Sequence, residues 1–159
     1  MLRLLQQLSW WVALVMVPVA LAGEQKPIKL SVVPEAIRAI ARDKLPDIRL
    51  VSANTETEPD GGYLYEIQGL LPDGRKVELD IYPDQRIQEI EIEFRHDMVP
   101  GAVLKAVERK LPGFEPDFIE ASHSRSLKVV RYEFVGKLGD NELDIDVSAD
   151  GRTIEVADR

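Results

Sequence analysis

Acidic residues recur at every second position in several short segments of this chain of 159 residues. In the segments 77–81, 89–93 and 143–147, Asp and Glu alternate with Val, Ile and Leu. Because successive side chains of a β-strand point to opposite faces of a sheet, we expect the acids to share one face and the aliphatic residues the other. The acids predicted to share that face are Glu66, Glu78, Asp80, Glu89, Glu91, Glu93, Glu133, Asp144, Asp146 and Glu155.

A face of this composition could act in two ways. Its carboxylates could dock a basic segment of a partner protein, or they could bind divalent cations, which prefer oxygen ligands. A third interpretation is a solvated face whose charges keep the protein soluble and prevent strands from pairing edge to edge. We take protein docking as the leading hypothesis, with divalent-cation binding or sensing as the functional alternative. The predicted partner-binding residues are Glu78, Asp80, Tyr82, Glu89, Glu91, Glu93, Asp144 and Asp146.

The sequence offers little for catalysis. It has two histidines, His96 and His123, and neither a G-x-S-x-G elbow, an H-E-x-x-H motif nor a Gly-rich phosphate loop. Carboxylate pairs hydrolyse glycosides only where one acid is desolvated, whereas a flat, solvated sheet would keep every acid ionised. A hydrolase that relies on His123 is therefore the weakest hypothesis. We predict a protein without enzymatic activity, catalytic residues or a cofactor.

The segment DVSADG, which begins at Asp146, has the oxygen-bearing residues and the glycine of the first half of a calcium loop. The bidentate Glu that such a loop needs at its twelfth position is replaced by Ala157. We therefore predict a hairpin turn here and assign no metal-ligating residue.

Two similar phrases point to the elements that position the acids. VPEAIRAIARDKLPD begins at Val33 and VPGAVLKAVERKLPG begins at Val99. Apolar residues recur in both at three- and four-residue spacing, which predicts amphipathic helices bounded by the prolines. Alternating segments separated by turn signals follow each phrase. The predicted fold is α+β, with two tandem repeats of one helix plus four antiparallel strands and with the helices packed on one face of the sheet or sheets.

The N-terminal segment predicts export. An apolar stretch follows Arg3, and Ala20-Leu21-Ala22 fits cleavage by signal peptidase. Because the stretch is shorter than the ~20 residues of a spanning helix, we expect cleavage rather than stable membrane insertion. The chain has no cysteine, so we expect no lipid anchor. The predicted divisions are a signal peptide (1–22), an N-terminal linker (23–32) and the two repeats (33–95 and 96–159).

The composition narrows the class of partner. Asp and Glu outnumber Lys and Arg by 28 to 20, which gives a net charge of −8. Nucleic-acid binding needs clustered basic residues to contact phosphates, so we expect none. With the export signal, this predicts a periplasmic or secreted protein whose partner is another protein of the cell envelope.

The order of these motifs resembles the tandem PepSY-like domain of secreted bacterial proteins. The residues that carry the resemblance are the Leu-Pro ends of the two phrases, YEI at Tyr65 with YEF at Tyr132, and DGRKVELDIYPDQRIQEIE from Asp73. The layout is similar to that of beta-lactamase-inhibitor proteins. The resemblance implies a non-catalytic binding or inhibitory module of the cell envelope. No residue here matches an inhibitory contact of that family, so no such contact is carried over.

Overall fold

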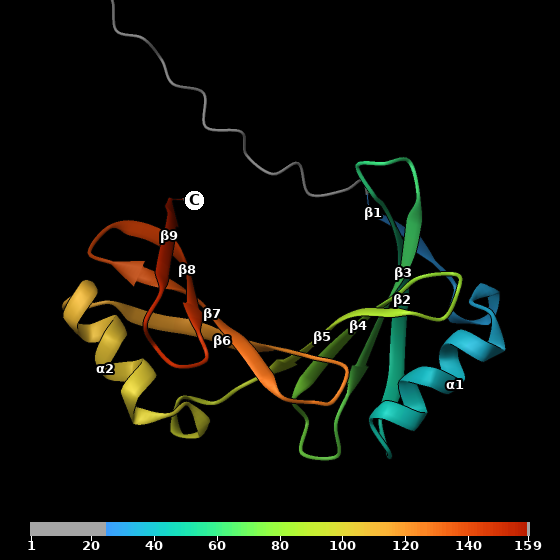
Figure 1. The fold of residues 1–159 in the computed structure, drawn as a ribbon, viewed down its shortest axis with the longest axis horizontal. Helices are drawn as coiled ribbons and strands as arrows, with labels where there is room; N and C mark the ends of the chain where they lie inside the picture. The colour runs from blue at the N-terminus through green and yellow to red at the C-terminus, as the bar shows by residue number, and fades with distance from the viewer. Residues whose placement is uncertain (1–24, 159) are drawn as a thin grey trace, which may run out of the picture.

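The computed structural model describes residues 25–158, and its strands form one antiparallel sheet (Figure 1). The predicted signal peptide lies outside the described residues. Each strand pairs with the next along the chain, so the order in the sheet is β1 to β9. The strands are β1 (Gln25–Ile28), β2 (Arg49–Thr57), β3 (Tyr63–Leu70), β4 (Lys76–Ile81), β5 (Ile87–Glu93), β6 (Glu115–His123), β7 (Val129–Leu138), β8 (Asn141–Ser148) and β9 (Ile154–Asp158).

The prediction of two amphipathic helices is confirmed. Helix α1 spans Glu35–Lys44 and helix α2 spans Gly101–Lys110, with Pro34 and Pro100 at their N-caps. Both helices end directly before a Leu-Pro step, because the residue before proline is disfavoured in helical geometry. A short 3₁₀ turn precedes each helix, η1 (Leu30–Val32) and η2 (His96–Met98). None of the described helices is both long and apolar enough to cross a membrane.

The predicted fold class, two tandem repeats of a helix plus four strands, is wrong. Residues 25–158 are mostly β, with a single nine-stranded sheet and, within this range, two α-helices of ten residues each. Strand β5 pairs directly with β6, with Ile90 opposite His123 and Ile92 opposite Ala121. A separate four-stranded unit would leave the backbone N–H and C=O groups of these strands unpaired along its edge. Pairing satisfies them, and strand β1, within the segment expected to be a linker, extends the other end of the sheet.

Both helices cover the same face of the sheet, and the hydrophobic core lies beneath them. One cluster of buried residues joins α1 to strands β2 to β5, with Ile67 and Leu79 at its centre. A second cluster joins α2 to strands β6 to β8 around Phe134 and Ile145. Phe94 packs against both clusters and so links them across the middle of the sheet.

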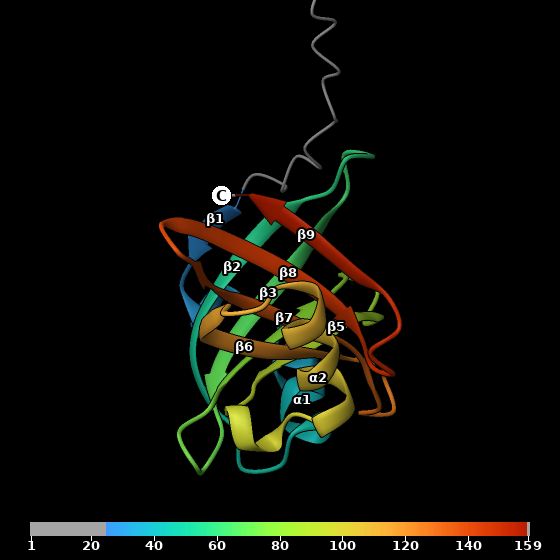
Figure 2. The ribbon, with the colours of Figure 1, turned by 90° about the vertical axis from the view of Figure 1, so that its left-hand side faces the viewer.

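The sheet is strongly twisted and curls away from its helices. Figure 1 shows α1 and α2 at opposite ends of the long axis with the sheet between them, and Figure 2 shows β2 and β3 crossing the direction of β6 and β8. Val51 of β2 and Phe118 of β6 line the same hollow although three strands lie between them in the sheet. The face without helices is therefore concave.

Candidate binding face

Carboxylates form rows across the strands on the concave side, which we call the acidic face. One row crosses five strands at paired positions, from β5 to β9: Glu93, Glu120, Glu133, Asp146 and Glu155. A second row crosses β3 to β5: Glu66, Asp80 and Glu89. Glu78 lies opposite Glu91 between the two rows, and Asp144 lies opposite Val135 at the far side of the first row. The structure therefore places on one face the acids that the alternation in the sequence predicted to lie together.

Tyr82 is the predicted site residue that the structure does not bring among the acid rows. It follows β4 in the turn toward β5, where its amide N–H donates to the carbonyl of Arg86 at 2.9 Å. The Arg86 guanidinium lies 4.7 Å from the centre of the Tyr82 ring, in a cation–π contact. The ring is therefore engaged within its own hairpin.

Arg131 of β7 is the cation embedded in the middle of the acidic face. Its Nη2 lies 3.4 Å from Oε1 of Glu89 and 3.9 Å from Oε1 of Glu91. Its Nε lies 3.0 Å from Oδ1 of Asp146, and Nη2 also donates to Oγ of Ser122 at 3.2 Å. One guanidinium is thus shared among the carboxyl groups of Glu89, Glu91 and Asp146.

Glu66 is the most deeply buried acid of this face, with a relative exposure of 1%. Its carboxylate accepts hydrogen bonds from the side-chain amides of Gln25, Asn54 and Gln68 at 2.7, 2.6 and 2.7 Å. Buried carboxylates are tolerated where hydrogen bonds replace the lost water. Neutral donors from β1, β2 and β3 therefore satisfy Glu66, and the Gln68 amide also donates to Glu78 at 3.1 Å.

Burial raises the pKa values of the neighbouring acids. Desolvation is the largest cause of the raised pKa of Glu78, Asp80 and Glu91, each to about 8, and nearby carboxylates raise these values further. The same two causes raise the pKa of Glu133 to about 7 and raise those of Glu120 and Asp146. The expectation of a flat, solvated sheet with every acid ionised is wrong, because curling half-buries the carboxyls and turns them toward one another.

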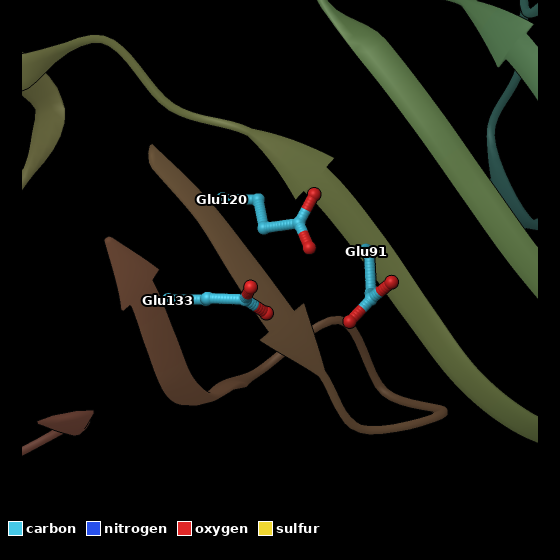
Figure 3. Close-up of side chains that lie close together, drawn as sticks. All are labelled: Glu91, Glu120 and Glu133. Atoms are coloured by element: carbon cyan, nitrogen blue, oxygen red, sulfur yellow. The ribbon is translucent and has the colours of Figure 1, made fainter. Parts of the chain in front are cut away.

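Three carboxylates from neighbouring strands converge near the centre of the face (Figure 3). Glu91 of β5, Glu120 of β6 and Glu133 of β7 each offer one oxygen, and these oxygens lie within 4.8 Å of one another. Like charges at this separation repel, so the cluster favours either protonation of its members or a bound cation.

A hollow of about 450 Å³ opens beside this cluster, and we call it the Phe118 hollow. Its apolar wall comes from β2, β3 and β6, with Val51, Leu70 and Phe118. Glu78, Glu91 and Glu120 supply acidic groups to the hollow, and Lys76 also lines it. The Nζ of Lys76 lies 5.7 Å from the centre of the Phe118 ring. The hollow combines an aromatic surface, aliphatic contacts and negative charge.

Several residues of this face were not among the site residues predicted from the sequence. Glu120 and Ser122 alternate with Ile119 and Ala121, but the histidine that follows weakens the pattern of an amphipathic strand. Gln68 was missed because an amide in a strand carries no charge pattern, although it bonds two acids here.

Two further candidates from the sequence, His123 and the segment DVSADG, lie in a core position and in a turn. His123 is buried on the helix-covered face with its ring 5.9 Å from that of Phe94, and desolvation lowers its pKa. This position gives the hydrolase hypothesis no support. The predicted turn in DVSADG is confirmed as the β8–β9 connection, in which the Ser148 hydroxyl donates to Asp150 at 2.8 Å.

Comparison with solved structures shows the fold of this chain in other proteins. A BLIP-like protein from Bacteroides fragilis is 18% identical with a TM-score of 0.61, over 79% of this chain and 85% of the other. A DUF2874 family protein from Bacteroides uniformis is 12% identical with a TM-score of 0.64, over 79% of this chain and 88% of the other. No family model and no curated protein matches the sequence. The chain therefore shares the fold of BLIP-like and DUF2874 proteins.

Proposed function

We propose that this protein is an exported, non-enzymatic binding module whose acidic face docks a cationic segment of a protein partner in the cell envelope. The observation that carries the proposal is the set of half-buried carboxylate rows around a single embedded guanidinium, that of Arg131. Such a face lowers its electrostatic energy by taking up protons or by binding a cation. A partner segment bearing several Lys or Arg side chains satisfies many of these carboxylates at once.

Two further observations support a binding role. The fold is that of a protein described as BLIP-like, and a PepSY-like module of this kind would act by binding or inhibition. The N-terminal segment with Ala20-Leu21-Ala22 favours a periplasmic or secreted location, where such a partner would be met. Concave surfaces with a few charged groups on apolar walls are typical of binding sites.

The proposal is tested with fluorescently labelled octa-lysine as a probe, by anisotropy at physiological ionic strength. The variant Glu78→Gln/Glu91→Gln/Glu120→Gln should lose about tenfold or more in affinity, since its amides cannot ionise to pair with a bound cation as the three carboxyl groups can. The matched control is Asp43→Asn/Glu108→Gln/Asp140→Asn, which replaces the same number of acids by amides at exposed positions elsewhere. An equal loss in both variants, or no binding by the unaltered protein, contradicts a localised docking face.

Divalent-cation binding is the second candidate, favoured by the convergence of Glu91, Glu120 and Glu133. It ranks lower because calcium takes six to eight oxygen ligands, usually including neutral carbonyls, whereas this cluster offers three carboxylates. Calorimetry with calcium chloride at physiological salt decides the matter. Heat of binding that Glu120→Gln abolishes would support the cation site, and no heat at millimolar calcium would exclude it.

A further inference from the structure

The Phe118 hollow differs from the rest of the acidic face in having an apolar wall. Val51 has a relative exposure of 51%, although a residue of its type is normally buried. Leu70 and Phe118 also line the hollow and are half-buried. A cationic ligand held by charge alone would need no such surface, so the wall is suited to a side chain with a long aliphatic stem.

The acidic residues of the hollow are suited to a cationic head group. Glu78, Glu91 and Glu120 line the hollow, and a bound cation would stabilise their ionised forms. Ligand pockets of proteins commonly have volumes of about 300–1,000 Å³, and the hollow, at about 450 Å³, is within this range. It has room for one extended side chain together with the backbone that carries it.

A cation of the protein itself already occupies the aromatic part of the hollow. The Lys76 ammonium group lies over the Phe118 ring at 5.7 Å from its centre, and Lys76 is otherwise an exposed residue at the start of β4. The Phe118 ring thus already faces a positive charge, as in a cation–π contact. An incoming cation would compete with Lys76 for the same ring.

We propose that the Phe118 hollow accepts one arginine side chain from the docked partner segment, with its guanidinium stacked on Phe118 in place of Lys76. The proposal rests on the proposed function, because the arginine belongs to the cationic segment that the acidic face binds. Arginine is favoured over lysine because its planar guanidinium stacks on a ring while its N–H groups bond carboxylates in a bidentate manner. Its aliphatic stem would lie along Val51 and Leu70.

The first test compares small probes that carry a single side chain. Nα-acetyl-arginine amide, Nα-acetyl-lysine amide and Nα-acetyl-citrulline amide are titrated into the ¹⁵N-labelled protein and followed by NMR. The expected result is saturable shifts at the amides of Phe118, Glu91 and Glu120, with arginine binding about three- to tenfold more tightly than lysine. Equal shifts for lysine and arginine, or shifts spread over the whole face, overturn the proposal.

The second test uses substitutions in the hollow with labelled octa-arginine and octa-lysine. Phe118→Leu should weaken octa-arginine about fivefold and octa-lysine less, since the ring is lost while the apolar wall remains. Lys76→Met should strengthen octa-arginine more than Lys137→Met does, although both remove one positive charge. Thermal unfolding verifies that each variant is folded.

The two proposals fail in different ways. If octa-lysine and octa-arginine bind equally and Phe118→Leu changes neither, the arginine pocket is overturned while the docking face stands. If neither peptide binds the unaltered protein, the docking face itself is overturned.

Discussion

The helix-covered face and the acidic face arise from the same strands by the same alternation, yet they differ in how their side chains are satisfied. On the helix-covered side, residues such as Leu79, Ile90 and Ile145 have no exposed surface and are packed under α1 and α2. On the acidic side, carboxylates are half-buried without a covering element, and several have a raised pKa. The first face is packed against elements of the chain itself, and the second holds half-buried carboxyl groups that the cations of a partner could pair with.

The curl of the sheet explains why the difference is so large. Curling spreads the convex side, where two helices fill the added space, and it brings the side chains of the concave side together. Arg131 and the amides around Glu66 relieve part of the resulting repulsion and desolvation. The region around Glu78, Glu91 and Glu120 has less relief, and the Phe118 hollow opens there.

The largest expected effect is the loss of stability when a core side chain on the helix-covered face is removed. Phe134→Ala should reduce the free energy of unfolding by about 3–5 kcal/mol, because the side chain is 1% exposed and its removal leaves a cavity under α2. Urea denaturation at neutral pH measures the change, with the exposed residue Val130 as the site of a control, Val130→Ala. A loss below about 1 kcal/mol would show that Phe134 is not packed as described.

A smaller loss of stability is expected from substitutions of Glu66, the most deeply buried acid of the acidic face. Glu66→Ala removes the acceptor of three amides and should cost about 2 kcal/mol. Glu66→Gln keeps the size of the side chain and one acceptor oxygen, so it should cost less. If both substitutions were neutral in urea denaturation, the hydrogen-bond network would not stabilise the junction of β1, β2 and β3.

The next largest effect is expected in the pH dependence of stability, which reports on the acids of the acidic face. Acids whose pKa rises to about 8 on folding hold protons in the folded state that the unfolded chain has lost, so stability falls as pH increases from about 5 to about 9. Glu91→Gln should reduce this fall, by about 1 kcal/mol or more at the alkaline end, and should have little effect near pH 5. Melting temperatures over this range test it, and a rise in stability toward pH 9 would contradict the burial of these acids.

The smallest effect concerns a turn outside both faces. Gln85 has a φ of 72°, a left-handed conformation that favours glycine, and Gly151 has a φ of 70° in the β8–β9 turn. Gln85→Gly should therefore stabilise the protein by about 0.5 kcal/mol. Gly151→Ala should destabilise it, because a Cβ there would lie 3.3 Å from the Ala102 carbonyl oxygen. Chemical denaturation of both variants measures the difference, and a loss of stability in Gln85→Gly would contradict the strain at this turn.

The sequence predicted the local elements because their signals are local. Helical spacing after Pro34 and Pro100 identified α1 and α2, and the alternation in β4, β5 and β8 assigned each acid to its face. The pairing of Ile90 with His123 depends on strands that are distant in the chain, and no local signal specifies it. This pairing is why the predicted pair of repeats is instead one sheet.

The properties of the site depended on that same non-local information. Whether Glu78 and Glu91 are solvated or half-buried is decided by the curl of the whole sheet, which the alternation does not encode. The Phe118 hollow likewise needs β2 and β6 to approach each other across three intervening strands. Composition and alternation could therefore predict an acidic face, but they could not predict its concavity or its raised pKa values.

The most direct test of cation docking on the acidic face is a count of the protons that leave the protein when a cation binds. Octa-arginine is titrated calorimetrically near pH 7.5 in buffers of different ionisation enthalpy. Because a bound cation lowers the raised pKa values of Glu78, Glu91 and their neighbours, we predict net proton release and an affinity that increases between about pH 6 and pH 9. Binding without proton release, or an affinity that decreases over this range, would contradict the claim that the half-buried carboxyls of the acidic face receive the partner.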